Sequence, residues 1–513
     1  MLLPQPDCLA KVTTMLQTGQ LANTSSYFHV NSTGGFENDP NGIINLTIEG
    51  CEALCGAGFA TYSVSEIFER LITWFFPMAL LLGNLQLSPL GFRWGVWTII
   101  HALGDPIDSI WSLLCKFELA RNCFSAVDQI VKSRFPDVTV DLTDRIDIAT
   151  MMVAFDEDTV DEELRTTSIY HRIEILLDNA TWDDARQKFR KAGKHLRDER
   201  IDQTFRTILA VGSYLHSPAS DFLAVISGPG SSDPPGHRIE YPVILSWLLT
   251  LVLLSAAAGG FASNQSCERV VRHLCESFGS AQQLGFQPCK DSKKYIRSIY
   301  TYRPHKRISD NWRLSFLAFF AVVFAILFSA WLSWIMPTKG FDCHSIMELT
   351  ILGVWIFSAF LTWSTWKIKR FQKYHVRIVF VKDAVVSLAV TLPILLASIG
   401  VFESCWCIGS VFSNGSNAYV GLNAAGMMIQ NAKGIDPGLM YGAYLVQFIM
   451  YCGIRLEYLA SRRIFVKEAS SSRLETRGLT IADSMPERSE SGHSSSANKP
   501  LLSPSPGEED QIR

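Results

Sequence analysis

The chain has 513 residues, of which 48% are hydrophobic and 11% aromatic, with a formal net charge of −3. A soluble protein of this length would struggle to bury so large an apolar and aromatic excess, so the composition indicates a membrane protein. The total charge carries little information, because membrane orientation depends on how Lys and Arg are distributed among the loops.

Five apolar stretches predict membrane-spanning helices, since a helix of roughly 20 residues is needed to cross the hydrocarbon core and satisfies its own backbone. They cover approximately residues 67–87, 241–262, 314–336, 346–366 and 383–402. Weaker candidates lie near 94–114, 206–226 and 438–458. The predicted fold class is an all-α polytopic membrane protein with about seven transmembrane helices.

The first 66 residues predict a lumenal or extracellular tail. The opening MLLPQPDCLAKVTTML lacks the cationic start and long apolar run of a cleavable signal peptide, so the first span is expected to act as the anchor signal. Glycosylation acceptor tripeptides begin at Asn23, Asn31 and Asn45. Their clustering in a tail with few cations predicts that the N-terminus faces outward.

The later loops give the orientation independently. The basic loop 263–313 and the segment KIKRFQKYHVRIVFVK after Trp366 are predicted to be cytosolic. The loops 337–345 and 403–437 carry one lysine each and are predicted to lie outside, where Asn414 is a further acceptor. The mixed basic and aromatic residues after Trp366 also predict contact with anionic lipids of the cytosolic leaflet.

An outward N-terminus and a cytosolic C-terminus require an odd number of crossings, so one of the eight candidates must be rejected. The cationic run 186–206 belongs in the cytosol, which it could not reach if 94–114 crossed fully. We therefore expect 94–114 to enter the membrane and return to the cytosolic side at Lys116, with 206–226 as a true span.

The predicted organisation has seven parts. These are an outer glycosylated tail (1–66), the first span and a broken re-entrant or interfacial helix (67–115), a helical cytosolic region (116–205), two spans (206–262), a basic cytosolic loop (263–313), four spans (314–458) and a cytosolic, Ser-, Pro- and Glu-rich disordered tail (459–513). The acidic run 156–163 lacks the spacing of a cation-binding loop and is expected to be solvated.

This topology divides the cysteines into two groups. Six are predicted outside, where an oxidising compartment can pair them: Cys8, Cys51, Cys55, Cys343, Cys405 and Cys407. Those in the cytosolic segments are expected to stay reduced. Disulfides are favoured over zinc because no companion histidine cluster is evident, and no metal site is predicted.

The stretch GDPIDS is the most chemically suggestive. Gly104 breaks a helix, Asp105 is a favoured N-cap, Pro106 suits the first helical position and Asp108 follows in the first turn. Together with His101, the two acids are a candidate proton or cation site in a discontinuous helix. The alternative, that the acids only cap an interfacial helix, is favoured because capping explains both.

Glu348 is the one notable acid within the five strongly apolar stretches and is a further candidate for that ion or structural site. Isolated histidines, among them His171, His195 and His344, are expected to be surface or interface residues rather than ligands.

Four segments carry a family resemblance: HALGDPIDSIWSLL, SWLLTLVLLSAAAGGF, IYTYRPHK and PTKGFDC. Together they resemble a family of uncharacterised multi-pass membrane proteins of filamentous fungi, over residues from about 70 to 366. The resemblance implies the same membrane architecture and brings no activity or catalytic residues.

Enzyme motifs for nucleophilic, zinc-hydrolase and nucleotide chemistry are absent from the sequence, so no catalytic residue and no cofactor is predicted. The favoured hypothesis is a non-enzymatic membrane scaffold or sensor; the alternative is a transporter or channel using the break near residues 101–108. The lipid bilayer is the expected partner, and no nucleic-acid partner is expected. The plasma membrane or a secretory-pathway or vacuolar membrane is the predicted location.

Overall fold

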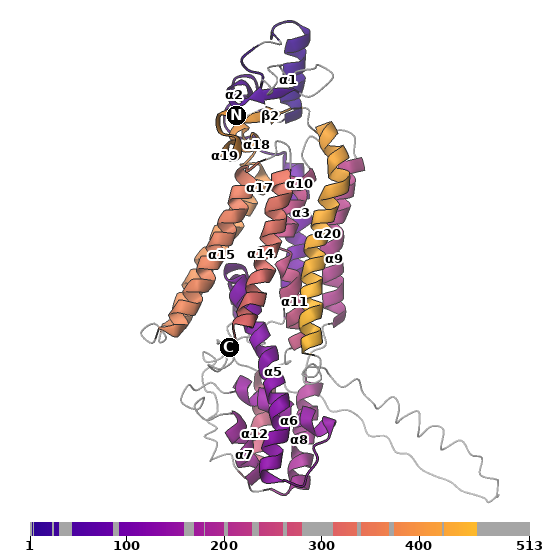
Figure 1. Cartoon of the computed structure of the whole chain (residues 1–513), viewed down its shortest axis with the longest axis vertical. Coiled ribbons are helices and arrows are strands. Elements are labelled where there is room, and N and C mark those ends of the chain that lie inside the picture. Colours follow the sequence, from indigo (N-terminus) through magenta and orange to yellow (C-terminus); the bar gives the residue numbers. More distant parts are fainter. Residues whose placement is uncertain are drawn as a thin grey trace, which may run out of the picture. The chain divides into compact units, whose positions relative to one another are not determined.

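The chain is described by a computed structural model (Figure 1). The structure describes residues 3, 5–22, 25–29, 44–85, 92–158, 169–178, 180–199, 204–227, 235–259, 264–279, 311–335, 340–368, 374–422 and 425–458. Several sequence predictions fall wholly or largely outside these ranges. They concern Asn23, Asn31, most of the acidic run 156–163, the basic loop 280–310, the lipid-contact residues 369–373 and the tail 459–513.

The N-terminal segment folds together with the loop that precedes the last long helix. Helix α1 (Gln5–Gln17) and helix α2 (Ile48–Cys55) pack beside strand β1 (Asn45–Thr47), which pairs antiparallel with β2 (Tyr419–Gly421). Short helices α18 (Cys405–Ile408), α19 (Val411–Asn414) and η3 (Gly415–Asn417) complete this loop. A shared apolar core that includes Phe28, Leu46 and Val420 joins the two segments into one unit. We call it the outer unit, after the location that the sequence predicts for both segments.

Three disulfides hold this outer unit. Cys8 pairs with Cys55, Cys51 with Cys405, and Cys343 with Cys407. These are the six cysteines that the topology predicted outside. The described cysteines that are not in disulfides are thiols in helices of the remaining fold: Cys115, Cys123, Cys267, Cys275 and Cys452.

The acceptor asparagines differ in accessibility. Asn45 is only 4% exposed and lies in β1, opposite Gly421. Asn414 is half-buried at the end of α19. Of these two sites, Asn414 therefore offers its side chain more readily to a modifying enzyme.

The main body is a bundle of long helices. Within the part of the chain that the structure describes, four helices are long and apolar enough to cross a membrane: α14 (Trp312–Ile335), α15 (Cys343–Lys367), α17 (His375–Ile399) and α20 (Ala425–Glu457). Helices α3 (Val64–Gly83) and α9 (Thr204–Ser227) pack against each other in the same bundle. The protein is thus an all-helical membrane protein, apart from the short β1–β2 pair in the described part of the chain.

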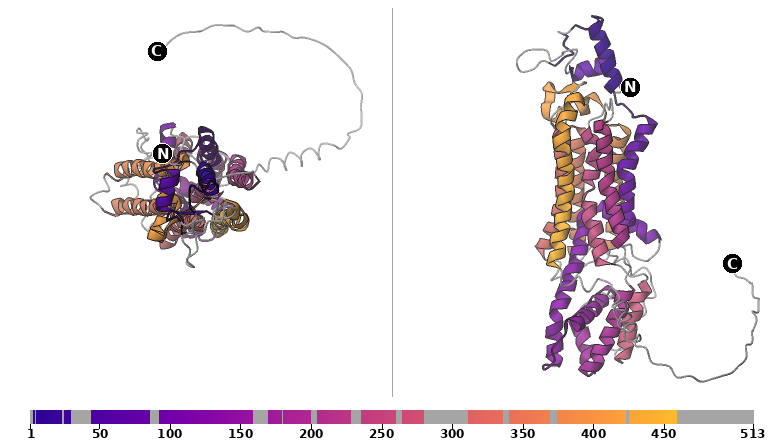
Figure 2. Two further views of the ribbon diagram at one scale, coloured as in Figure 1. Left: turned by 90° about the horizontal axis from the view of Figure 1, so that it is seen from above. Right: turned by 90° about the vertical axis from the view of Figure 1, so that its right-hand side faces the viewer.

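The apolar stretch 241–262 lies at the centre of the bundle and is interrupted by a turn. Its two helices are α10 (Pro235–Ile244) and α11 (Trp247–Ala258). Helix α11 is apolar on all sides and almost fully buried, because it contacts α3, α5, α9, α14 and α20. Figures 1 and 2 show α9 and α20 beside α11.

The helices at the periphery of the bundle expose large apolar side chains. Phe68 and Ile72 on α3, Ile208 on α9 and Phe357 on α15 are each about 60% exposed. Such large exposed apolar side chains suit a lipid environment better than water.

The predicted helical region 116–205 is built from the second half of α5 (Pro106–Arg134) and helices α6 (Leu142–Asp158), α7 (Ile169–Asp178) and α8 (Trp182–Asp198). Helix α12 (Asn264–Ser277), from the basic segment, packs on α6 and α8. A buried ion pair of 2.5 Å between Arg197 and Asp147 links α8 to α6.

Candidate functional site

The predicted break is present at Gly104. Helix α4 (Phe92–Gly104) ends there, and α5 begins at Pro106 after the N-cap residue Asp105. The Asp105 Oδ1 atom accepts a hydrogen bond of 3.0 Å from the backbone N–H of Asp108. One carboxylate oxygen of Asp105 therefore satisfies an N-terminal N–H of the new helix.

Helix α4 runs in the same direction as α17. Trp97 contacts Phe380, and one turn further along α4 His101 contacts Asp383. Gly104 lies so close to the backbone of Asp383 that a Cβ atom at residue 104 would stand 2.5 Å from its carbonyl oxygen. Glycine at this position is what allows the end of α4 to touch α17.

Helix α5 runs opposite to α4 and parallel to its neighbour α15. Trp355 donates to the carbonyl of Leu103, and Trp111 contacts Trp366 farther along both helices. Helices α15 and α17 are antiparallel to each other. Since α4 runs parallel to α17 and α5 runs parallel to α15, α4 and α5 are also antiparallel. The chain therefore enters and leaves the bundle at the same end. The chain reverses direction at the break.

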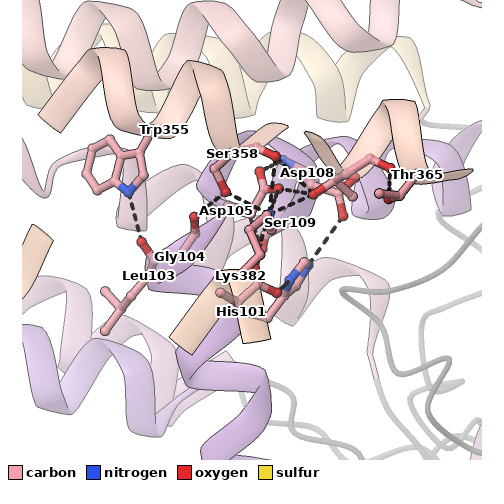
Figure 3. A network of polar contacts seen from close by, with 12 residues as sticks. His101, Leu103, Gly104, Asp105, Asp108, Ser109, Trp355, Ser358, Thr365 and Lys382 are labelled. Atoms are coloured by element: carbon pink, nitrogen blue, oxygen red, sulfur yellow. Dashed lines mark hydrogen bonds and ion pairs between the residues drawn. The ribbon is translucent and has the colours of Figure 1, made fainter. Parts of the chain in front are cut away.

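Lys382 on α17 is the centre of a buried polar network at this break (Figure 3). Its Nζ atom lies 2.6 Å from Asp105 Oδ2 and 2.8 Å from Asp383 Oδ1. The hydroxyl oxygens of Ser358 and Thr362, both on α15, are each 2.7 Å away. The ammonium group is thereby solvated by protein oxygens in place of water.

The two hydroxyl groups also fix the break itself. Ser358 donates to the carbonyl of Gly104 at 2.8 Å, and Thr362 donates to Asp105 Oδ2 at 2.5 Å. The carbonyl at the end of α4 and the second oxygen of Asp105 therefore both have partners on α15.

His101 bridges two further acids. Its Nδ1 atom is 2.6 Å from Asp383 Oδ2, and its Nε2 atom is 3.3 Å from Asp108 Oδ2. The side chains of His101, Asp108, Lys382 and Asp383 are at most 10% exposed, and Asp105 is fully buried. We call His101, Asp105, Asp108, Lys382 and Asp383 the Lys382 cluster.

The Lys382 cluster has more acids than bases. Its three carboxyl groups lie with one lysine and one histidine. Buried ionisable side chains are costly unless they are paired and hydrogen-bonded, and here each of the five has a charged partner. Among the described residues no group of acids, histidines and cysteines has the geometry to hold a metal ion.

Glu348 does not belong to this cluster. It lies on α15 ten residues before Ser358, which separates the two positions by about 15 Å along the helix. Its Oε1 atom accepts a 2.6 Å hydrogen bond from Ser329 on α14. The expected grouping of Glu348 with His101, Asp105 and Asp108 is therefore wrong.

His344 belongs near Glu348 and is not a surface residue. It is 5% exposed, and its Nδ1 atom lies 2.6 Å from Glu240 Oε1 on α10. Of the two predicted settings, surface or interface, the ring occupies an interface, that of α15 with α10. His171 and His195, with side chains 59% and 58% exposed, do lie at the surface. We call Glu240, Ser329, His344 and Glu348 the Glu348 cluster.

Three ionisable members of these clusters escaped sequence reasoning: Lys382, Asp383 and Glu240. Lys382 was counted among the topogenic cations after Trp366, yet α17 already begins at His375. Asp383 and Glu240 each fell at the edge of a predicted span. A cation next to an acid where a hydrophobic stretch begins is the signal that could have marked Lys382 and Asp383.

Comparison with protein-family models, curated proteins and solved structures finds no match for this chain. The resemblance to a fungal membrane family stays a prediction.

Proposed function

We propose that this chain is a proton-coupled membrane transporter that binds its proton at the Lys382 cluster. The observation that carries the proposal is the set of five buried ionisable side chains at a helix break, among helices suited to span a membrane. Ionisable groups at membrane depth are costly and accompany proton relays, and broken helices hold the ion sites of transporters.

The position of Lys382 supports a mechanism. Its Nζ atom lies between Asp105, at the α4–α5 break, and Asp383, on its own helix α17. Protonation of Asp105 weakens the ion pair that ties the break to α17, while Asp383 retains Lys382. Proton binding therefore favours an arrangement in which α4 and α5 are released from α17, which gives two states of different proton affinity.

The topology that accompanies this proposal has seven crossings. In addition to α14, α15, α17 and α20, the crossings are α3, α9 and the α10–α11 pair, which pack in the same bundle. The reversal at Gly104 makes α4 and the start of α5 re-entrant. The disulfide-bonded unit supports an outer location at one end, in a secretory-pathway, vacuolar or plasma membrane.

Glycan mapping tests this topology. We expect glycan on Asn23, Asn31 or Asn414, less on the buried Asn45, and none on Asn179 or Asn264, because the last two lie in segments proposed to be cytosolic. Single Asn→Gln variants, scored by the mobility shift on deglycosylation, measure this. Glycan on Asn179 would contradict the re-entrant assignment and make 94–114 a full crossing.

A vesicle assay tests transport. Purified full-length protein is reconstituted with a trapped pH-sensitive dye, and the outer pH is lowered with the membrane potential clamped. The assay is run in buffer and with a mixture of amino acids, sugars and carboxylic acids. We expect faster acidification than in protein-free vesicles, and loss of the difference in Lys382→Met.

Arg121→Met is the matched control, because Arg121 pairs with Glu457 at the surface, with both side chains about half exposed. Acidification that equals that of empty vesicles under every condition would refute the transporter.

A non-enzymatic scaffold or sensor is the second candidate. One observation favours it: Cys51–Cys405 joins the N-terminal segment to the loop after α17, and Cys343–Cys407 joins that loop to the start of α15. A rigid connection of this kind can transmit a change caused by a partner bound at the disulfide-bonded unit to the helices. Absence of proton movement with intact folding would leave this candidate standing.

A further inference from the structure

We propose that the Glu348 cluster is a second proton-binding site, in which Glu348 holds the proton and exchanges it with the side of the protein that carries the disulfides. The proposal goes beyond the function assigned to the Lys382 cluster, because it concerns different residues near the other end of α15. Only its role as the outer half of a transport pathway rests on the proposed function.

The surroundings of Glu348 favour its neutral form. The residue is fully buried, and its Oε1 atom accepts a hydrogen bond of 2.6 Å from the Ser329 hydroxyl. Its Oε2 atom has no hydrogen-bond donor among the residues that the structure describes. A buried carboxylate with a single neutral donor is strongly disfavoured, whereas a proton on Oε2 removes the charge and leaves the Ser329 bond in place.

Neighbouring charges act in the same sense. Two further acids lie near Glu348: Glu240 on α10, whose backbone carbonyl is 3.1 Å from the same Ser329 hydroxyl, and Asp342, the N-cap residue of α15. The nearby imidazole of His344 is engaged by Glu240 at 2.6 Å. The imidazole therefore serves Glu240, and it gives no hydrogen bond to Glu348 Oε2.

A series of polar side chains begins beside His344. The Tyr241 hydroxyl, also on α10, is 3.5 Å from His344 Nδ1. Tyr241 in turn lies within electrostatic range of Tyr62 and of Arg70 on α3, and Arg70 stacks on the Tyr62 ring.

Tyr62 completes the connection to the surface. Its hydroxyl donates to Glu403 at 2.6 Å, and Glu403 is half-buried in the loop after α17. The series His344, Tyr241, Tyr62 and Glu403 therefore leads from the Glu348 cluster toward the outer unit. Cys343, which precedes His344, anchors the start of α15 there through its disulfide to Cys407.

The Glu348 and Lys382 clusters share helix α15 but lie toward its opposite ends. The outer one contacts the first two turns of the helix, and the other contacts Ser358 and Thr362 in the second half. If transport occurs, a tilt of α15 is a direct means of coupling the two proton sites.

Infrared spectroscopy of the purified full chain tests the proton on Glu348 without a gradient or a substrate. At neutral pH we expect a carbonyl band of a buried protonated carboxylic acid that shifts in D2O. The band should be lost in Glu348→Gln and retained in Glu403→Gln, a control at the half-buried far end of the polar series. Because glutamine resembles a protonated glutamate, Glu348→Gln should also keep the wild-type Tm.

Ser329→Ala is a second probe in case Glu348→Gln fails to fold. Loss of the hydroxyl donor to Oε1 is expected to shift the same band without abolishing it. The proposal would be overturned if Glu348→Gln left the spectrum unchanged, or if Ser329→Ala left the frequency of the band unchanged. A proton found on Glu348 in a protein that moves no protons would keep this inference and refute transport.

Discussion

Replacement of Lys382 by methionine is expected to destabilise the folded protein by about 3–5 kcal/mol, the usual result of removing one partner from a buried ion pair. Methionine fills a similar volume but leaves Asp105 and Asp383 without the ammonium group that lies 2.6 and 2.8 Å from them. Thermal and denaturant unfolding of the detergent-purified protein measures the loss. Arg121→Met, at a half-exposed pair, is expected to cost less than about 1 kcal/mol.

The double variant Asp105→Asn with Lys382→Met separates structure from function. Asparagine still accepts the backbone N–H of Asp108, so the cap survives, while the unpaired charge at residue 105 is gone. We expect the double variant to recover part of the stability lost in Lys382→Met and to remain inactive in the vesicle assay. Equal stability of Lys382→Met and wild type would show that the ion pair is absent.

The same reasoning revises the role of Asp105. An N-cap alone predicts that Asp105→Asn is nearly silent, because the amide oxygen replaces the carboxylate oxygen. The second oxygen of Asp105, however, contacts Lys382 and Thr362. Capping therefore accounts for one carboxylate oxygen of Asp105. The contact of the other oxygen with Lys382 on α17 accounts for the charge of this side chain.

Local sequence chemistry predicted the break well because its causes are local. Gly104, Asp105 and Pro106 each have strong positional preferences at helix ends, and these act within one turn. The long apolar helices α14 and α15 were also predicted to within about three residues, since hydrophobicity and length determine them.

The partners of the break could not be predicted in the same way. Lys382 stands 277 positions after Asp105, and only the packing of α4 against α17 brings them together. A lysine at the end of a basic segment resembles any other topogenic cation. The cysteines gave a similar result: their location outside was predicted, but many pairings remained open until the outer unit brought Cys51 beside Cys405.

Substitution of Gly104 by alanine is expected to separate α4 from α17. The added Cβ atom would stand 2.5 Å from the carbonyl oxygen and 2.8 Å from the Cα atom of Asp383. Both are backbone atoms of a helix that cannot yield without moving as a whole, so α4 must shift away. We expect a loss of about 1–3 kcal/mol in the free energy of unfolding, as for other overpacked cores.

Gly353→Ala on the exposed face of α15 is the matched control, because a Cβ atom there meets nothing within 4 Å. That variant should be neutral or more stable by up to about 1 kcal/mol, the helix-propensity gain of alanine over glycine. The vesicle assay adds a second measurement, since displacement of α4 removes His101 from Asp383 and alters the proton site itself. A Gly104→Ala protein with wild-type stability and proton movement would mean that the close contact of α4 with α17 does not hold the Lys382 cluster together.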